Sequence, residues 1–332
     1  MFTSCSVVNH VAEALLKSRV QELTIRNFTN FNRRRNLQNK RMSNFDKWIK
    51  IGKYAVFPWS ISGIETCVVV KSPDLNVVFD VGYSCKESLS SKHVFLSHGH
   101  MDHISGVPQH AAKRSLFGTG KAKYYTPVHL IDSLTTICRE YAKMAGNIPD
   151  LEHINIIPAV VGETVYLPNN YIMKPFPTLH RVESQGYIAY QKQLKKEFQG
   201  LTSEVIGAKI KEGVEINDFV PEIAYTGDTV FELFQKPPIE DLLKVKLLIM
   251  EATYIEEEEN GKNMVEMARK YGHIHLKEII SNAELFKNVE SIVLIHFSDR
   301  YSANAIEKLV PEMLPESLVH KVHVATIAKE QY

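Results

Sequence analysis

The sequence predicts an α/β protein in which two β-sheets pack face to face and helices cover both outer faces. Short apolar runs typical of strands recur from about residue 47 onward, and in the second half they alternate with segments of helical periodicity. No linker-like segment interrupts the chain after that point. Residues 47–332 are therefore predicted to form one domain with two β-rich halves.

The individual elements follow from periodicity and turn signals. A hairpin is predicted around the turn signal Ser72-Pro73-Asp74, and a second pair of strands flanks Pro168-Asn169-Asn170. The predicted strands are 66–70, 76–80, 92–97, 164–167, 171–176, 222–226, 245–250, 291–297 and 319–327. The predicted helices are 128–145, 191–199, 203–212, 264–270, 276–286 and 303–313.

The most informative segment, His98-Gly99-His100-Met101-Asp102-His103, directly follows the predicted strand 92–97. His98 and His100 occupy alternate positions, so they point the same way along an extended chain. Asp102 and His103 follow where the chain turns into a helix and can face a second point nearby. A lone histidine is usually structural, but this density of imidazole and carboxylate without thiolate suits a divalent metal such as zinc in an open, catalytic site.

Three further candidate ligands lie at or just after the ends of predicted strands: His180, Asp228 and His296. Loops at one edge of a two-sheet structure would bring such strand ends together. With the first segment they make five histidines and two carboxylates, an inventory that fits two metal ions. We expect His98, His100 and His180 on one ion, and Asp102, His103 and His296 on the other, with Asp228 bridging.

These motifs carry a family resemblance. The order HxHxDH (98–103), TLH (178–180), TGDT (226–229) and IHFS (295–298) resembles the metallo-β-lactamase superfamily over roughly residues 50–327. Met250-Glu251-Ala252-Thr253 resembles the HEAT motif, and Gly272-His273-Ile274-His275 the GHST motif, of its tRNase Z (ribonuclease Z) branch. This resemblance implies a four-layer αβ/βα sandwich, two Zn²⁺ ions (or Mn²⁺), and phosphodiester hydrolysis by a metal-bridging hydroxide.

The resemblance also implies precursor tRNA as substrate, cut on the 3′ side of the acceptor stem. Asp102, Glu251 and His273 are the expected catalytic residues, with Glu251 orienting and charging His273 as the general acid for the leaving 3′-oxygen. His275 is the alternative acid, although Leu276 and the residues after it suggest that a helix starts there. Asp80 is expected to support a ligating histidine, with Ser97 and Thr229 either doing likewise or forming turns.

Other functions stay open at this point. The chain has the lysine-bearing segments 191–199 and 203–212, without proline, where the family usually carries a Gly/Pro-rich arm that grips tRNA. Those lysines either contact phosphates or form an ordinary solvated face, and the acidic run Glu256–Glu259 is expected to be a solvated loop. A small phosphodiester such as a cyclic nucleotide, a thioester, or a non-catalytic binding role are the alternatives.

Composition sets the remaining bounds. The 332 residues carry a formal net charge of +1, no apolar run has the length of a membrane span, and the cysteines form no CxxC pair, so they are expected to be free thiols. Residues 1–46 form a basic extension, expected to be a transit peptide for mitochondrion or plastid, or else a disordered tail of a cytoplasmic protein. The family resemblance further implies a possible homodimer.

Overall fold

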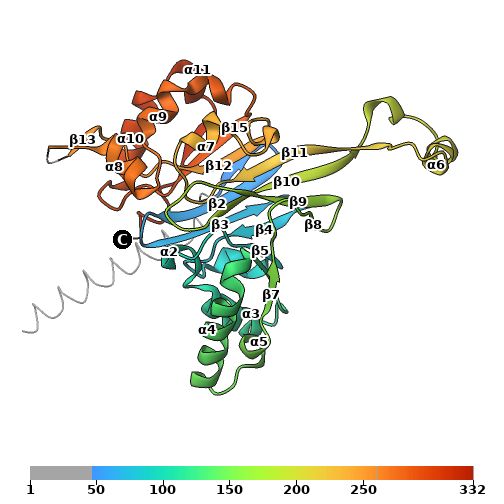
Figure 1. The fold of residues 1–332 in the computed structure, drawn as a ribbon, viewed down its shortest axis with the longest axis horizontal. Helices are drawn as coiled ribbons and strands as arrows, with labels where there is room; N and C mark the ends of the chain where they lie inside the picture. The colour runs from blue at the N-terminus through green and yellow to red at the C-terminus, as the bar shows by residue number, and fades with distance from the viewer. Residues whose placement is uncertain (1–46, 260, 332) are drawn as a thin grey trace, which may run out of the picture. The chain divides into compact units, whose positions relative to one another are not determined.

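Two seven-stranded mixed sheets form the centre of the computed structural model, which describes residues 47–259 and 261–331 (Figure 1). One sheet has the order β1-β2-β3-β4-β5-β6-β7 and the other β16-β15-β12-β11-β10-β9-β8. The strands are β1 (Ile49–Ile51), β2 (Tyr54–Ile61), β3 (Glu65–Lys71), β4 (Asn76–Phe79), β5 (His93–Phe95), β6 (Lys123–Thr126), β7 (Asn155–Pro158), β8 (Val165–Tyr166), β9 (Tyr171–Pro177), β10 (Gln185–Leu194), β11 (Asn217–Tyr225), β12 (Leu247–Glu251), β15 (Ser291–Ile295) and β16 (Val322–Val324).

Helices lie against the outer face of each sheet, which confirms the predicted layer order (Figure 1). The α-helices are α2 (Met101–Ile104), α3 (Val107–Leu116), α4 (Ile131–Met144), α5 (Pro149–Glu152), α6 (Ser203–Lys211), α7 (Glu232–Gln235), α8 (Met264–Tyr271), α9 (Leu276–Ser281), α10 (Ala303–Met313) and α11 (Glu316–Val319). Short 3₁₀ helices are η1 (Lys86–Ser90), η2 (Val128–Leu130), η3 (Lys196–Phe198), η4 (Glu240–Leu243) and η5 (Ala283–Phe286).

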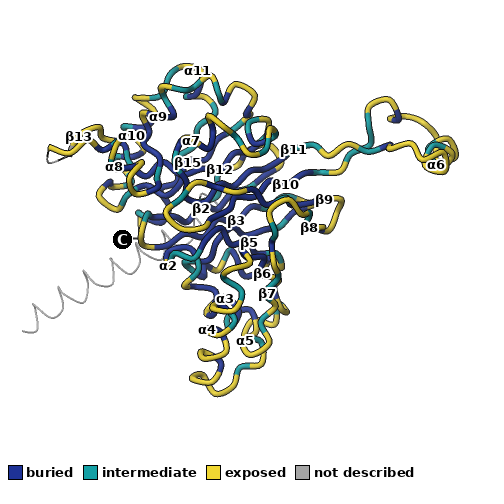
Figure 2. The backbone as a smooth tube through the Cα atoms, viewed as in Figure 1, coloured by how far each residue is buried: buried dark blue, intermediate teal, exposed yellow. Residues whose placement is uncertain are grey.

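Three apolar cores hold these layers together. The core between the sheets includes Phe79 and Tyr225, whose rings stack with centroids 4.7 Å apart. A second core fills the space between the first sheet and α3, α4 and α5, and a third lies between the second sheet and the helices of the C-terminal half. Central strands are buried on both faces (Figure 2), which explains why they appear in the sequence as continuous apolar runs.

Every strand predicted from the sequence has a counterpart in the two sheets. The predicted hairpin is β3 and β4, paired antiparallel with Val70 opposite Val77. Helices α4, α6, α8 and α10 match predicted segments, whereas the predicted helix 276–286 divides into α9 and η5. The sequence patterns do not single out β1, β2, β6, β7 and β10, which are recognisable mainly by their pairing with neighbours.

The predicted helix 191–199 is wrong. Residues 191–194 continue β10 and pair with β11 in the register Gln191 to Val220 and Leu194 to Asn217. Cross-strand pairing outweighs the helical preference of glutamine and lysine there. The two strands form a long hairpin, the arm, that projects from the second sheet and carries α6 near its tip (Figures 1 and 2).

Two further expectations meet different outcomes. Glu258–Glu259 of the acidic run lies in β13 (Glu258–Glu259), which forms a two-stranded hairpin with β14 (Lys262–Asn263) rather than a plain loop. Within the described ranges, no helix has the length and apolar character that a membrane crossing needs. The basic extension at residues 1–46 lies outside the described residues.

Candidate metal centre and active site

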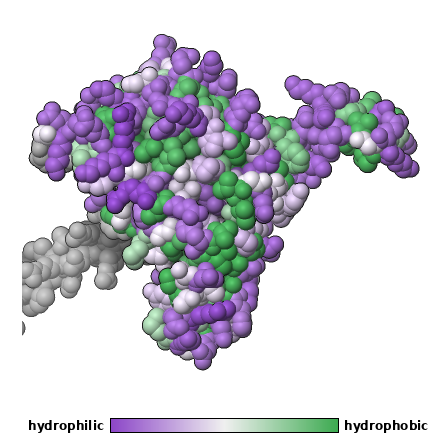
Figure 3. Space-filling view, in the orientation of Figure 1, coloured by the Kyte–Doolittle hydropathy of each residue, from purple (hydrophilic) through white to green (hydrophobic). Residues whose placement is uncertain are grey.

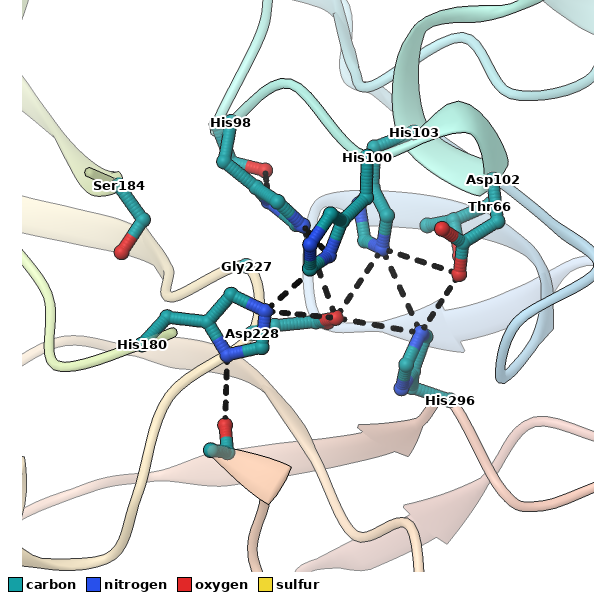
Figure 4. A network of polar contacts seen from close by, with 12 residues as sticks. Thr66, His98, His100, Asp102, His103, His180, Ser184, Gly227, Asp228 and His296 are labelled. Atoms are coloured by element: carbon teal, nitrogen blue, oxygen red, sulfur yellow. Dashed lines mark hydrogen bonds and ion pairs between the residues drawn. The ribbon is translucent and has the colours of Figure 1, made fainter. Parts of the chain in front are cut away.

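The expected metal ligands come from several strand ends of both sheets and meet at one edge of the sandwich (Figure 4). His98 and His100 follow β5, and the short helix α2 presents Asp102 and His103. His180 follows β9, Asp228 follows β11, and His296 follows β15. The parallel pairing of β12 with both β11 and β15 places these carboxyl ends side by side.

The first cluster of donor atoms consists of His98, His100, His180 and Asp228, all within 4.8 Å of one another. His100 Nδ1 lies 3.1 Å from His98 Nε2 and 3.2 Å from His180 Nε2. Asp228 Oδ2 lies 3.8 Å from His98 Nε2 and 4.0 Å from His180 Nε2. Three imidazoles and a carboxylate thus face a common centre.

The second cluster consists of Asp102, His103, His296 and the same Asp228. Asp228 Oδ2 is 3.3 Å from His103 Nε2 and 3.5 Å from His296 Nε2. Asp102 Oδ2 is 3.3 Å from His296 Nε2 and 3.5 Å from His103 Nε2. Asp228 therefore lies between two donor sets, which is the position expected of a bridging ligand.

Four of these histidines have a hydrogen-bond partner at the outer ring nitrogen, and this orients the inner nitrogen. His103 Nδ1 lies 2.7 Å from Asp80 Oδ2, and His180 Nδ1 lies 2.8 Å from the Gly272 carbonyl. His98 Nδ1 faces Ser97 Oγ at 2.9 Å, and His296 Nδ1 faces Thr253 Oγ1 at 3.1 Å. A proton on each outer nitrogen leaves an unprotonated inner nitrogen aimed at the centre, as a divalent metal requires.

The protonation states favour cation binding. Burial and the charge of nearby His103 lower the pKa of His98 to about 2. Burial also lowers the pKa of His100 and His180. Burial alone would raise the pKa of Asp228, but His103 and His296 outweigh it and hold the carboxyl well below its usual range. Burial lowers the pKa of His103, but the carboxylates of Asp228 and Asp80 outweigh it and hold that pKa well above its usual range. Neutral imidazoles and ionised carboxylates are the forms that coordinate a metal, so the donor set fits divalent ions, with His103 releasing a proton when a metal binds.

Asp80 supports residues 98–103, the candidate metal-binding turn, through its hydrogen bonds. Its carboxylate accepts hydrogen bonds from Ser97 N at 2.7 Å, Ser97 Oγ at 2.7 Å and Tyr225 OH at 2.5 Å, besides contacting His103. Asp80 and His296 both adopt positive φ, 56° and 63°, a backbone conformation that non-glycine residues rarely hold. Such conformations persist where surrounding contacts enforce them, and here they turn two strand ends toward the centre.

Glu251 and His273 lie beside the second cluster. His273 Nδ1 is 3.1 Å from Glu251 Oε1, and Glu251 also accepts hydrogen bonds from Thr229 N at 2.8 Å, Ile274 N at 3.1 Å and Thr253 Oγ1 at 2.6 Å. Burial lowers the pKa of His273, but the Glu251 carboxylate outweighs it and raises the pKa to about 9. His273 is therefore positioned as a protonated imidazole at neutral pH.

His275 has a different place. It is the N-cap of α9 and accepts a hydrogen bond from Lys277 N at 3.0 Å, while its Nε2 faces the Glu256 carbonyl at 2.9 Å. Glu278 completes a capping box by accepting from His275 N at 3.2 Å. Both ring nitrogens of His275 are thus occupied at a helix start, as the following residues suggest in the sequence.

Several supporting groups were not predicted. Thr253 links Glu251 to His296, Tyr225 holds Asp80, and Gly63 N donates to Asp102 Oδ2 at 2.9 Å. Thr253 and Tyr225 adjoin recognisable motifs, so their positions carried a signal. Gly63 acts through its backbone, which no side-chain pattern reveals.

This chain resembles known proteins in both sequence and fold. Residues 85–297 match the Beta-lactamase superfamily domain. The structure resembles that of the short form of human tRNase Z with a TM-score of 0.51 and 17% identity, covering 82% of this chain and 96% of that one. The metallo-β-lactamase fold protein YhfI from Bacillus subtilis gives a TM-score of 0.52 at 15% identity, with the same coverage of 82% and 96%. Both establish the fold.

Sequence relatives place the chain more closely. It is 36% identical to tRNase Z TRZ1 of Arabidopsis thaliana over 284 residues, covering 84% of this chain and 98% of that protein. It is also 36% identical to the chloroplastic tRNase Z TRZ2 of the same plant over 271 residues, covering 80% of this chain and 73% of that one. The chain belongs to the tRNase Z (ribonuclease Z) family of the β-lactamase superfamily.

Proposed function

We propose that this protein is a metal-dependent endoribonuclease that cuts precursor tRNA on the 3′ side of the acceptor stem. The single observation that carries the proposal is the Glu251–His273 pair beside a donor set for two metals. A thioester hydrolase of the same fold gives that pair no evident task, whereas a phosphodiesterase needs a proton for its leaving oxygen. The names of the relatives supply the tRNA substrate.

Two Zn²⁺ ions are the proposed cofactors, with Mn²⁺ as the alternative. His98, His100 and His180 would hold one, Asp102, His103 and His296 the other, and Asp228 both. Paired divalent ions supply hydroxide near neutral pH and neutralise charge that builds up at phosphorus. The nitrogen and oxygen donors without sulfur suit zinc in a catalytic rather than a structural role.

The protein's own residues would then handle the leaving group. With Nδ1 of His273 committed to Glu251, Nε2 remains as the atom that gives a proton to the departing 3′-oxygen. Glu251 is itself fixed by its contacts with Thr229, Thr253 and Ile274, so it holds the imidazole in one orientation. The proposed catalytic residues are therefore Asp102, which would be a metal ligand, Glu251, which orients the imidazole, and His273, which donates the proton.

Two arginine–tyrosine pairs flank the Glu251–His273 pair and suit an RNA strand. The Arg181 guanidinium lies 5.6 Å from the Tyr271 ring centroid, and that of Arg300 lies 5.2 Å from the Tyr254 ring centroid. Tyr271 and Tyr254 adjoin the two segments that carry His273 and Glu251. Arginine binds phosphates and aromatic rings stack on bases, so these pairs would orient the nucleotides around the cut.

The proposal extends to residues 1–46 and to assembly. The basic extension would direct the protein into a plastid or mitochondrion, a role in keeping with the chloroplastic relative. Expression of residues 1–46 fused to a fluorescent protein tests this.

Exposed apolar side chains on and before α4 would support a homodimer: they are Val128, Ile137, Tyr141 and Met144. Light scattering on the purified chain measures whether it dimerises.

The test uses zinc-loaded protein with two substrates. A 3′-extended precursor tRNA and bis-p-nitrophenyl phosphate are offered separately, and Asp228→Ala serves as the inactive control. Cleavage of both substrates, with the RNA cut at the end of the acceptor stem, is the expected result. Cleavage of the simple diester alone would assign the enzyme to small phosphodiesters, and inactivity on both would overturn the proposal.

A further inference from the structure

Cys67 and Cys85 lie side by side close to the loop that supports the metal-binding turn. Their Sγ atoms are 3.6 Å apart, and both side chains are buried. Cys67 occupies the middle of β3, and Cys85 immediately precedes η1. We propose that these two cysteines form a reversible disulfide, and that this bond slows hydrolysis at the neighbouring metal centre.

Residues 80–85 connect the two thiols to the metal-binding turn through backbone contacts. Gly82 N donates to the Thr66 carbonyl in β3 at 2.8 Å, next to Cys67. On the other side, Val81 N donates to the His103 carbonyl at 2.7 Å, and Gly106 N donates to the Val81 carbonyl at 2.8 Å. The loop is therefore hydrogen-bonded both to β3 and to the chain around His103.

Gly82 leaves no free space between these partners. A Cβ atom at Gly82 would lie 1.8 Å from the Asp102 carbonyl oxygen and 2.9 Å from Thr66 N, so the backbones are already in close contact. Closely packed groups transmit a displacement rather than absorb it. A shift of Gly82 must therefore move the backbone of Asp102, a proposed metal ligand.

A disulfide would produce such a shift. An S–S bond is about 2.05 Å long, so the sulfur atoms have to approach by roughly 1.5 Å. Cys67 is held in a central strand, paired with Trp59 of β2, and β4 flanks it on the other side. The movement consequently falls on Cys85 and on the loop before it.

The oxidation balances with a peroxide as the oxidant. The sulfur of Cys85 attacks one peroxide oxygen, the O–O bond breaks, and a sulfenic acid and one water form. The sulfur of Cys67 then displaces the hydroxyl from that sulfenic acid, giving the disulfide and a second water. Two electrons pass from the sulfurs to hydrogen peroxide, and both thiol protons end in water.

The environment favours Cys85 as the attacking thiol. Its contact with the Cys67 thiol and with Ser88 lowers the pKa of Cys85 despite burial, whereas the contact with Cys85 and burial raise the pKa of Cys67. The thiolate is the reactive form, so the proposal places the first step at Cys85.

The experiment treats the zinc-loaded full chain with hydrogen peroxide and digests it without reduction. Zinc does not change oxidation state, so effects on the metal itself are avoided. Mass spectrometry is expected to find the peptides of Cys67 and Cys85 linked, and hydrolysis of bis-p-nitrophenyl phosphate is expected to fall at least three-fold. Dithiothreitol should restore the rate, which separates the disulfide from methionine oxidation.

Two matched variants isolate the pair. Cys85→Ser should keep its rate under peroxide, whereas Cys138→Ser, which changes a buried thiol on α4, should lose activity as the wild type does. Only the rate measurement rests on the proposed function. Zinc affinity from chelator competition, expected to weaken several-fold on oxidation, provides a readout without it. Unlinked peptides would overturn the disulfide, and linked peptides with unchanged rate and affinity would overturn its effect.

Discussion

At the scale of single residues, the proposed roles of Glu251 and His273 in giving the leaving oxygen its proton can be tested through the pKa of His273. The carboxylate raises the pKa of His273 to about 9, so the acid form predominates below that pH and is lost above it. His273→Ala should lower kcat by about 10²–10⁴-fold while the metal content stays near that of the wild type. Metal analysis and steady-state kinetics measure both quantities.

The pH profile separates this role from a structural one. Wild type should lose activity as pH rises through the pKa of His273. Glu251→Gln should move this alkaline limb of the profile to lower pH, because it removes the negative charge that raises the pKa of His273. His275→Asn is the control, since asparagine keeps an acceptor at the N-cap of α9. A large rate loss in His275→Asn, together with an unchanged rate in His273→Ala, would contradict the prediction and identify His275 as the general acid.

Asp80 supports a second prediction at this scale. Its carboxylate fixes His103, Ser97 and Tyr225, so its loss frees the ring of a proposed metal ligand. Asp80→Asn should weaken zinc binding by about 10–100-fold, measured by competition with a chromophoric chelator. Ser105→Ala, next to the same turn but exposed, is a matched control, and equal affinities in the two variants would contradict the role of Asp80.

The residues of the site differ in how far the sequence predicts them. His98, His100, Asp102 and His103 are adjacent in the chain, so their convergence depends only on local geometry. The Gly272 carbonyl and the Gly63 amide reach His180 and Asp102 through backbone atoms, which every residue possesses. No pattern of side chains could identify those two contacts.

At the scale of elements, the arm shows where local propensity fails. Residues 191–194 contain glutamine and lysine, which suit a helix, yet their backbone groups pair with β11 across the hairpin. The tip does form the predicted α6. Strand pairing depends on a partner about 25 residues away, and a local pattern contains no information about that partner.

The composition of the arm bears on its role. Residues 191–219 contain five lysines and five acidic residues, and Lys209 forms an ion pair with Glu212 at 2.8 Å. Figure 3 shows apolar surface on the arm among hydrophilic residues. The exposed apolar side chains near α6 are Leu201, Val205, Ile210 and Val214. Contact with RNA through this arm would depend on shape and apolar packing more than on net charge.

Shortening the arm tests this at the scale where it acts. The register at Leu194 and Asn217 allows residues 195–216 to be replaced by an Asn-Gly turn without disturbing the sheet. The shortened enzyme should hydrolyse bis-p-nitrophenyl phosphate normally while its KM for precursor tRNA rises at least ten-fold. The salt dependence of RNA binding should change little, because the removed charges balance. An unchanged KM for tRNA would show that the arm has no part in binding.

At the scale of the whole molecule, residues from both sheets make up the site, and neither half of the chain contains it alone. His103 and His296 are 193 residues apart in sequence, and their Nε2 atoms lie 3.4 Å apart. The sequence predicts this meeting only through the common placement of ligands after strands. The sequence patterns do not single out β2, which pairs with its sequence neighbours β1 and β3, or β10, whose first six residues are buried.

The stability of the whole fold should depend on a histidine outside the proposed ligand set. His110 on α3 is buried, its Nδ1 facing Tyr124 OH at 2.8 Å and its Nε2 the Ser88 carbonyl at 3.4 Å. Burial lowers the pKa of His110 to about 4. The unfolded chain, with an ordinary histidine pKa of about 6.5, therefore binds more protons between these values, and the free energy of unfolding falls as pH decreases through this window.

Between pH 7 and pH 5 the loss from His110 should be about 2 kcal/mol, with most of the remainder appearing by pH 4. His110→Gln keeps a neutral acceptor for Tyr124 and should show a shallower pH dependence, even if the variant is less stable at pH 7. Urea unfolding of metal-free wild type and variant at both pH values measures the difference. Because the other titrating groups are shared, parallel stability curves would show that His110 is protonated equally in both states.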